Sequence, residues 1–375
     1  MLVAGEASGD LHGATLCRAL RAARPGCRLF GMGGARMAGA WMELLVDVTT
    51  AAAAGASEAV SRVPLLWRAY KRLSAVLEGA GRPRVLVVID FPEFNLRLAR
   101  AARRAGIPVV YFVPPQIWAW RGGRVRAIRR LISLVLAVFP FETAIYRRAG
   151  VPVEFVGHPV LDALTEAPDR AAARSQLGLD ARTRVVGLLP GSRREEVARA
   201  IPPMREAAAM VAAKHPDVKF VLALAPTVAP AEVRRLLGVT PAIAVESGRT
   251  YGVMRAADLL VVTSGTATLE AGVLGTPMIV CYRLSRLSAL LARLLISVPW
   301  FSLPNLALGR GAVPELFQEE VSGVRLGREV LRLLGTPGAL EAQRTALREL
   351  SAQLGEPGVG ARAARLVLAE AGVGR

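Results

Sequence analysis

The chain has 375 residues, which is more than one ordinary hydrophobic core accommodates, so two domains are expected. Its hydrophobic share of 53% is high, but no apolar run reaches the roughly 20 residues of a membrane span. Glu6 and Asp10 exclude an N-terminal signal peptide. The three cysteines and three histidines are too scattered for a disulfide framework or a metal site. These features predict a cytoplasmic protein without a metal.

The formal charge of +18 comes almost entirely from arginine, because only Lys71, Lys214 and Lys219 are lysines. Biased codon usage is one explanation. The functional explanation is a negatively charged partner, which is an anionic membrane surface, an anionic substrate or nucleic acid. No basic run interleaved with aromatic residues, helix-turn-helix or zinc pattern is present, so a nucleic-acid partner is not expected.

Apolar runs that end in glycine-containing loops recur along the first half of the chain. They predict strands at residues 2–4, 28–30, 84–89, 107–113, 134–138 and 154–156, with a helix at 11–23. The first strand is short, which suggests a start codon upstream of Met1. This series predicts a doubly wound parallel sheet, whose ligands bind beyond the carboxyl ends of the strands.

A second series of the same kind begins after a linker and helix at residues 162–173. Strands are predicted at 185–189, 220–225, 242–245, 259–262 and 278–282, with helices at 195–213 and 267–274. Beyond Asn305 and Arg310 the chain is expected to be mostly helical. We therefore expect two Rossmann-like α/β domains, residues 1–160 and 161–350, facing a central cleft. A last helical segment, 351–375, is expected to pack back towards the first domain.

Residues 258–270 form the most informative local pattern, a buried strand followed by a loop of small residues and then a helix. Such a step directs backbone N–H groups and the positive end of a helix at one point, where phosphate binds well. Gly265 allows close approach of a ligand, and the hydroxyls of Ser264 and Thr266 can cap the helix or bind an oxygen. Glu270, one turn later, can accept from ribose hydroxyls. The alternative is a capped helix start that binds nothing.

Asp90 follows the predicted strand 84–89 directly. A carboxylate at the carboxyl end of a parallel strand is well placed for proton transfer. The alternative is that Asp90 only caps the helix that starts near Glu93.

Two stretches, residues 60–72 and 283–301, mix apolar side chains with arginine and lysine. The second has leucines at helical spacing and ends in Trp300 and Phe301. This pattern is typical of a basic amphipathic helix at a bilayer interface. A helix that faces the core with a solvated basic side is the alternative for both stretches.

Taken together, the motifs resemble the lipid-A-disaccharide synthase family. The matching segments cover nearly the whole chain in the expected order: residues 5–10, 88–95, 118–121, 139–142, 157–159, 188–197, 263–270, 282–283 and 302–306. No single motif carries the resemblance alone. Two departures are the missing residues before the first strand and the bland composition of residues 52–59, where the family has a more hydrophobic segment.

The resemblance implies a glycosyltransferase-B fold and transfer from UDP-2,3-diacylglucosamine to 2,3-diacylglucosamine 1-phosphate (lipid X). The acceptor's 6-hydroxyl attacks the anomeric carbon with inversion, giving a β-1′,6-linked disaccharide and UDP. No metal or other cofactor is implied. The enzyme would be peripheral on the cytoplasmic face of the inner membrane, in contact with anionic lipids through the two basic apolar stretches. The resemblance leaves the oligomeric state open, and a homodimer is one of the alternatives.

The resemblance also implies roles for single residues. Asp90 resembles the general base, Arg193 resembles a residue that holds diphosphate or acceptor phosphate, and Asn305 matches an important position whose task is open. Further substrate-binding positions are Glu6, Ser8, Gly9, Asp10, Gly191, Ser192, Tyr282 and Arg283. The UDP-binding positions are Ser264, Gly265, Thr266, Ala267, Thr268 and Glu270.

Three alternatives remain at this point. One is another transferase of the same fold, such as a transferase that moves N-acetylglucosamine from UDP to a lipid acceptor. A second is a nucleotide-sugar epimerase, which shares the fold but needs no membrane surface. The third is a non-enzymatic, arginine-rich protein that binds nucleic acid or lipid.

Overall fold

The computed structural model describes residues 1–47, 63–115, 123–238, 243–284 and 299–372. Two compact units are present, one of Met1–Ala163 with Leu354–Arg375 and one of Leu164–Gln353. The predicted motif at 118–121, residues 60–62 and most of the basic stretch 283–301 lie outside the described residues. No helix in the described part of the chain is long and apolar enough to cross a membrane.

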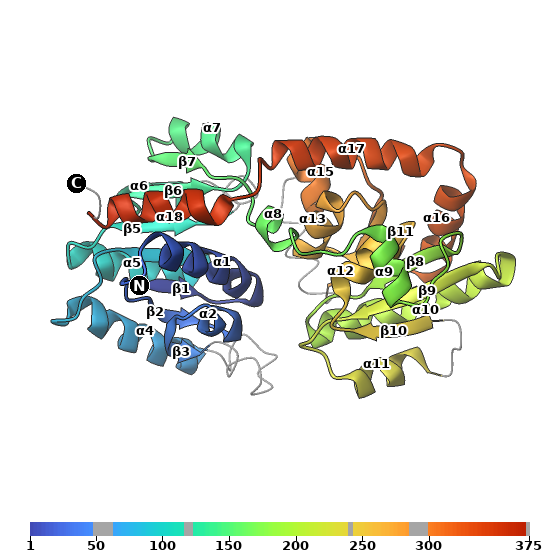
Figure 1. The fold of residues 1–375 in the computed structure, drawn as a ribbon, viewed down its shortest axis with the longest axis horizontal. Coiled ribbons are helices and arrows are strands. Elements are labelled where there is room, and N and C mark those ends of the chain that lie inside the picture. The colour runs from blue at the N-terminus through green and yellow to red at the C-terminus, as the bar shows by residue number, and fades with distance from the viewer. Residues whose placement is uncertain (48–62, 116–122, 239–242, 285–298, 373–375) are drawn as a thin grey trace. The chain divides into compact units, whose positions relative to one another are not determined.

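The first unit is built on a seven-stranded parallel sheet with the strand order β3-β2-β1-β4-β5-β6-β7 (Figure 1). The strands are β1 (Leu2–Ala4), β2 (Phe30–Gly33), β3 (Glu43–Asp47), β4 (Leu86–Ile89), β5 (Val109–Phe112), β6 (Leu134–Ala137) and β7 (Val153–Phe155). The inner strands β1, β4, β5 and β6 are wholly buried, which explains their continuous apolar runs. Strand β3 was not predicted. It lies at the sheet edge and is only partly buried, and its short apolar run ends at an acidic residue on each side.

Helices cover this sheet and bring the end of the chain back to its beginning. They are α1 (Ala7–Ala23), α2 (Ala35–Gly39), α4 (Val63–Glu78), α5 (Pro92–Arg104), α6 (Gly123–Leu131), α7 (Pro140–Arg148), α8 (Val160–Ala163) and α18 (Val359–Glu370). Helix α18 lies beside α1 (Figure 1). The Asp162 carboxylate accepts the backbone N–H groups of Gly358, Val359 and Gly360 at 2.6, 3.1 and 2.8 Å, and so caps α18.

The second unit contains a six-stranded parallel sheet with the order β10-β9-β8-β11-β12-β13. Its strands are β8 (Arg184–Leu189), β9 (Val218–Leu224), β10 (Ile243–Ser247), β11 (Leu259–Thr263), β12 (Met278–Tyr282) and β13 (Glu315–Phe317). Its helices are α9 (Arg170–Gln176), α10 (Arg194–Lys214), α11 (Pro230–Leu237), α12 (Thr250–Ala256), α13 (Thr266–Val273), α15 (Leu303–Leu308), the 3-10 turn η1 (Gln318–Glu320), α16 (Gly323–Gly335) and α17 (Ala339–Gln353). Strand β13 was not predicted, since its three residues become a strand only by pairing with β12.

Both sheets confirm the doubly wound class, and each has a point where the winding direction reverses. In the first unit β1 lies between β2 and β4, and in the second β8 lies between β9 and β11. Connections leave the two central strands on opposite faces of the sheet, which opens a crevice at their carboxyl ends. The loops after β1, β4, β8 and β11 are therefore where ligand-binding residues are expected.

Candidate active site

Asp90 follows β4 in the left-handed region, with φ of +50°, and Phe91 has φ of +47°. Such a backbone costs a non-glycine residue about 1–3 kcal/mol and needs support from its surroundings. The Asn95 amide donates to the carbonyls of Ile89 at 3.1 Å and Asp90 at 2.6 Å. The Tyr111 hydroxyl donates to the same Asp90 carbonyl at 2.9 Å. Two side chains thus fix the backbone from which the Asp90 carboxylate projects.

Phe91, not Asp90, occupies the N-cap position of α5. Asp90 therefore lies one residue before the cap position that the alternative assigned to it. Asn95 and Tyr111 were not among the predicted site residues. Asn95 lies within the resembling segment 88–95, but nothing in that segment signals a left-handed Asp90 for its amide to hold.

The loop after β1 packs directly on this corner. A Cβ added at Gly5 would lie 2.1 Å from the Phe91 ring, so glycine is required for the contact. Glu6 is exposed at the N-cap of α1, and Ser8 is partly buried in its first turn. Gly9 packs on Ala4, because a Cβ added at Gly9 would lie 3.3 Å from the Ala4 methyl carbon.

Asp10 has a folding role in the same loop. Its carboxylate is buried and accepts the backbone N–H groups of Gly34 at 2.7 Å, Arg36 at 3.1 Å and Met37 at 3.1 Å. These bonds cap α2 and tie the loop after β2 to α1. Of the residues predicted in this loop, Glu6 and Ser8 are more accessible to a ligand than Gly9 and Asp10.

In the second unit, the loop after β8 turns sharply through Gly191 into α10. Gly191 has φ of +107°, and a Cβ there would meet Glu196 Oε2 at 2.9 Å. The Ser192 carbonyl accepts the Thr227 hydroxyl at 2.6 Å. Arg193 is the N-cap of α10 and its exposed guanidinium pairs with Glu196 at 3.2 Å. An arginine therefore stands at the positive end of a 21-residue helix.

The loop after β11, the neighbouring strand, turns through Gly265, whose φ is +155°. The Ser264 hydroxyl donates to the Phe301 carbonyl at 3.3 Å, and the Thr268 hydroxyl donates to the Gly265 carbonyl at 2.8 Å. Helix α13 begins at Thr266 without a side-chain cap. By helical geometry the N–H groups of Thr266 and Ala267 have no acceptor within the helix. The hydroxyls thus shape the loop while the first turn offers donors to an anion.

Glu270 lies one turn further along α13 and is partly buried. The hydroxyl of Tyr251, from α12, donates to Glu270 Oε1 at 3.0 Å. Tyr251 was not predicted, because its place beside Glu270 depends on how α12 and α13 pack. The bond restricts the rotation of a carboxylate that is expected to accept hydroxyl groups.

Tyr282, at the end of β12, lies near the residues of the loops after β8 and β11. Partial burial raises the pKa of its phenol, and the charge of Glu196 adds to this, while Arg193 and Arg199 oppose it. Its ring stacks on Phe301, with the centroids 6.4 Å apart. Arg283 next to it is exposed. The structure thus brings Tyr282 within electrostatic range of Arg193, whereas the sequence separates them by 89 positions.

Asn305 differs from the other predicted catalytic residues because it is buried, with 1% of its surface exposed. Its amide nitrogen donates to the Val313 carbonyl at 2.9 Å and to Glu315 at 2.7 Å. Its oxygen accepts the N–H groups of Ala312 at 2.7 Å and Val313 at 2.9 Å. Through these hydrogen bonds Asn305 holds the segment that leads into β13.

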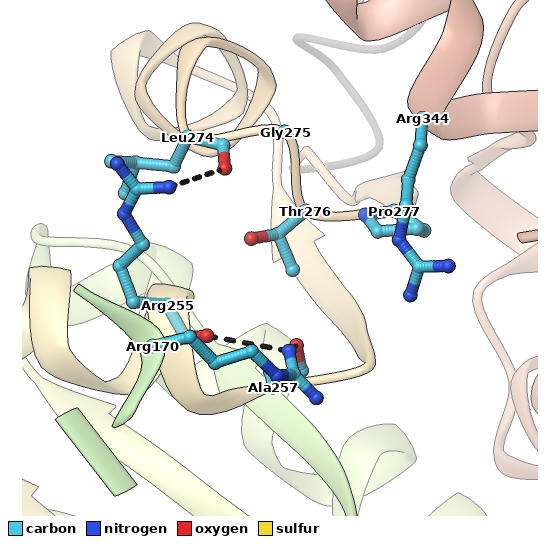
Figure 2. A pocket seen from close by; sticks show the side chains of 8 residues that line it. All are labelled: Arg170, Arg255, Ala257, Leu274, Gly275, Thr276, Pro277 and Arg344. Carbon is cyan, nitrogen blue, oxygen red and sulfur yellow. Dashed lines mark hydrogen bonds between the residues drawn. The ribbon is translucent and has the colours of Figure 1, made fainter. Parts of the chain in front are cut away.

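A pocket of about 150 Å³ lies elsewhere in the second unit, at the amino ends of β11 and β12 (Figure 2). It is lined by Arg170, Arg255 and Arg344 with the chain from Leu274 to Pro277. Arg170 is held by the Ala257 carbonyl at 2.8 Å and by Asp258. This pocket lies at the amino ends of the strands, whereas Ser264 follows the carboxyl end of β11, so the pocket is not part of the candidate site. No cluster of His, Cys, Asp and Glu within the described residues suits a metal ion.

Comparisons with known proteins show the family to which the chain belongs. The family model described as lipid-A-disaccharide synthetase matches residues 1–359. The lipid-A-disaccharide synthase of Myxococcus xanthus is 44% identical over 372 residues, which cover 98% of this chain and 96% of the relative. That of Geobacter sulfurreducens is 41% identical over 369 residues, with the same two coverages. The chain belongs to the lipid-A-disaccharide synthase family. Members of this family are glycosyltransferases that form the lipid A disaccharide, and this is the activity of the chain.

Solved structures show the same fold at low identity. The UDP-GlcNAc 2-epimerase of Neisseria meningitidis, solved with UDP-GlcNAc, superposes with a TM-score of 0.64 at 14% identity, covering 98% of both chains. The glycosyltransferase of kitacinnamycin superposes with a TM-score of 0.62 at 20% identity and the same coverage. This member of the lipid-A-disaccharide synthase family thus has the glycosyltransferase-B architecture expected from its sequence. At these identities the likeness concerns fold alone.

Proposed function

We propose that this enzyme transfers 2,3-diacylglucosamine from UDP to the 6-hydroxyl of lipid X, with inversion at the anomeric carbon. The first unit binds the acceptor and supplies the base, and the second unit binds the UDP-sugar. The paired strand-end loops of the second unit carry this proposal. Neighbouring strands β8 and β11 each lead through a glycine with positive φ into a helix N-terminus, and Arg193 stands beside one of them.

These loops suit a diphosphate that becomes a leaving group. Two helix N-termini and the guanidinium of Arg193 supply positive charge where negative charge develops as the glycosidic bond breaks. Backbone donors of Gly191, Ser192, Gly265, Thr266 and Ala267 would bind the phosphate oxygens. Ser264 and Thr268 hold the loop in shape. The chemistry then needs no metal to stabilise UDP.

Glu270 is the proposed ribose ligand. A carboxylate accepts hydroxyl hydrogens only, so it suits the two ribose hydroxyls of UDP. The bond from Tyr251 holds one carboxylate oxygen at 3.0 Å, which leaves the orientation of the group defined before UDP binds. Tyr282 and Arg283 are proposed to contact the substrate next to Arg193.

Asp90 is the proposed general base. Inversion is a single displacement, in which the acceptor hydroxyl must lose its proton as it attacks. The carboxylate at the end of β4 is fixed at its backbone by Asn95 and Tyr111. Glu6, Ser8 and Gly9 in the neighbouring loop are proposed to orient the acceptor, with Asp10 holding that loop in place.

The lipid substrates require access to a membrane, and α4 carries side chains that suit one. Val63, Leu65 and Trp67 are 60%, 39% and 53% exposed in its first turns. Further along the helix, Ala69, Leu73 and Leu77 are buried in the core. Basic residues such as Lys71, which lies 5.5 Å over the Trp67 ring, would meet anionic headgroups. We propose peripheral binding at the cytoplasmic face of the inner membrane.

Release of UDP tests the proposed reaction. Purified protein in detergent micelles is given UDP-2,3-diacylglucosamine, lipid X, or both, and UDP is measured with a coupled assay. The proposal predicts release only when both are present. Release from the donor alone would point to a hydrolase, and conversion of UDP-2,3-diacylglucosamine into another UDP-sugar without release of UDP would point to an epimerase.

A further inference from the structure

The carboxylate of Glu315, at the start of β13, collects four hydrogen bonds. Its Oε1 accepts the Ser302 N–H at 3.0 Å, the Ser302 hydroxyl at 2.6 Å and the Asn305 amide at 2.7 Å. Its Oε2 accepts the Phe301 N–H at 2.9 Å. A single charged side chain therefore fixes the chain from Phe301 to Asn305, with charge-assisted bonds that are stronger than neutral ones.

Asn305 contributes to the same network with its full capacity. A carboxamide can donate two hydrogen bonds and accept two. Asn305 donates to Val313 and Glu315 and accepts from Ala312 and Val313. Since all four positions are used within the protein and the residue is buried, its amide has no further bond to offer a substrate. The role that the family resemblance implies for Asn305 is therefore expected to act through the backbone segment that Asn305 holds.

The segment that Glu315 fixes contacts the proposed diphosphate loop. The Phe301 carbonyl accepts the Ser264 hydroxyl at 3.3 Å. The Phe301 ring packs on Tyr282 and Phe317, with centroids 6.4 and 5.7 Å away. Glu315 accepts the N–H of Ser302, which belongs to the same peptide group as the Phe301 carbonyl that Ser264 binds. The position of the Ser264 hydroxyl depends on where this peptide lies.

We propose that Glu315 is a positioning residue of the donor site, which with Asn305 and Ser302 holds Phe301 so that its carbonyl orients Ser264. The inference rests on the proposed UDP site in the second unit. Glutamine at position 315 cannot replace the carboxylate, because its single oxygen serves one side of the network. Its NH2 group would then face another donor, either the N–H of Phe301 or those of Ser302 and Asn305.

The test is a double-mutant cycle between Glu315→Gln and Ser264→Ala, read as the dissociation constant of UDP and as kcat with both substrates. In the wild-type background Glu315→Gln should weaken UDP binding and lower kcat, each by about tenfold or more. In the Ser264→Ala background the same change should cost less than about twofold, because the group that Glu315 positions is already absent. The matched control is Glu341→Gln, an exposed carboxylate on α17 that accepts from Arg344 and Arg348. It should leave both values unchanged.

Equal losses in the two backgrounds would overturn the inference, since a general loss of stability acts regardless of Ser264. If Glu315→Gln does not fold, Ser302→Ala replaces it. That change removes only the hydroxyl bond to Glu315 and the cap of α15, and should show a smaller loss with the same dependence on Ser264. A wild-type protein that binds no UDP would instead contradict the proposed function.

Discussion

The hydroxyl of Tyr111 donates a 2.9 Å hydrogen bond to the backbone carbonyl of Asp90, a residue in the left-handed region with φ of +50°. The bond joins β5 to the residue that follows β4. Asn95 binds the same carbonyl from α5. Together they hold the proposed base in a backbone conformation that aspartate adopts only at a cost.

Removing the Tyr111 hydroxyl should therefore impair catalysis more than folding. Tyr111→Phe is predicted to lower kcat by about 10- to 100-fold, because a shift of about 1 Å in a reacting group costs rates of that order. UDP binding should not change, since its proposed site is in the second unit. The control is Tyr146→Phe, which also removes a buried hydroxyl of the first unit, bonded to Pro115 at 3.2 Å. Equal effects of the two changes on kcat would refute the role of Tyr111.

The contact between Gly5 and Phe91 predicts a steric effect at the same corner. Gly5→Ala places a Cβ 2.1 Å from the Phe91 ring, so the ring and its neighbour Asp90 must move. Overpacking of this kind costs about 1–3 kcal/mol in stability, and we expect activity to fall with it. Gly26→Ala is the control, because a Cβ there meets nothing within 4 Å. Thermal unfolding and kcat measure both effects. A stable, fully active Gly5→Ala protein would contradict the packing described.

Two buried histidines predict how stability depends on pH. Burial lowers the pKa of His12 from 6.5 to about 4. It also lowers the pKa of His158, whose ring is 5.8 Å from that of His12. The unfolded chain therefore binds more protons than the folded one below pH 6.5, and stability must fall as the pH drops through that value.

For His12 alone the predicted loss between pH 7.5 and 5.5 is roughly 1 kcal/mol. His12→Leu should reduce this pH dependence, measured by denaturant unfolding at both values. His215→Gln, at an exposed position after α10, should leave it unchanged. If His12→Leu has the same pH dependence as the wild type, the burial of a neutral His12 is not the cause.

Exposed apolar side chains on α4 predict membrane binding. Trp67→Ser should lower the partition coefficient for vesicles containing anionic phosphatidylglycerol by about tenfold. The core face of α4 stays intact, so the fold should be kept. Trp41→Ser is the control, because Trp41 is 64% exposed but precedes β3 rather than lying on α4. Equal vesicle binding by the wild type and Trp67→Ser would exclude α4 as the contact surface.

Much of the fold could be predicted from sequence because its inner strands are buried on both faces and read as apolar runs. The loops after β1, β8 and β11 contain glycines, which make close contacts after β1 and have positive φ after β8 and β11, and glycines also leave a local signal. Strands β3 and β13 leave a weaker signal, since one is a partly buried edge with an acidic residue at each end and the other is three residues long. Their identity depends on pairing with strands distant in sequence.

The supporting residues of the site were harder to predict than its loops. Asn95, Tyr111 and Glu315 act by binding backbone groups whose positions depend on tertiary packing. Residue type gives no sign of this, because the same asparagine or glutamate on a surface would bind water. The sequence likewise could not show that the Asp10 carboxylate is used in capping α2.

The formation of disaccharide by the wild type and by Asp90→Asn tests the central claim most directly. Both proteins are incubated with UDP-2,3-diacylglucosamine and lipid X, the product is followed by mass spectrometry, and its linkage is determined by NMR. The proposal predicts a β-1′,6-linked disaccharide from the wild type. It predicts a rate lower by about 10²- to 10⁴-fold from Asp90→Asn, with UDP affinity unchanged. A folded wild-type protein that forms no disaccharide at any detergent level, or an Asp90→Asn protein of full activity, would contradict it.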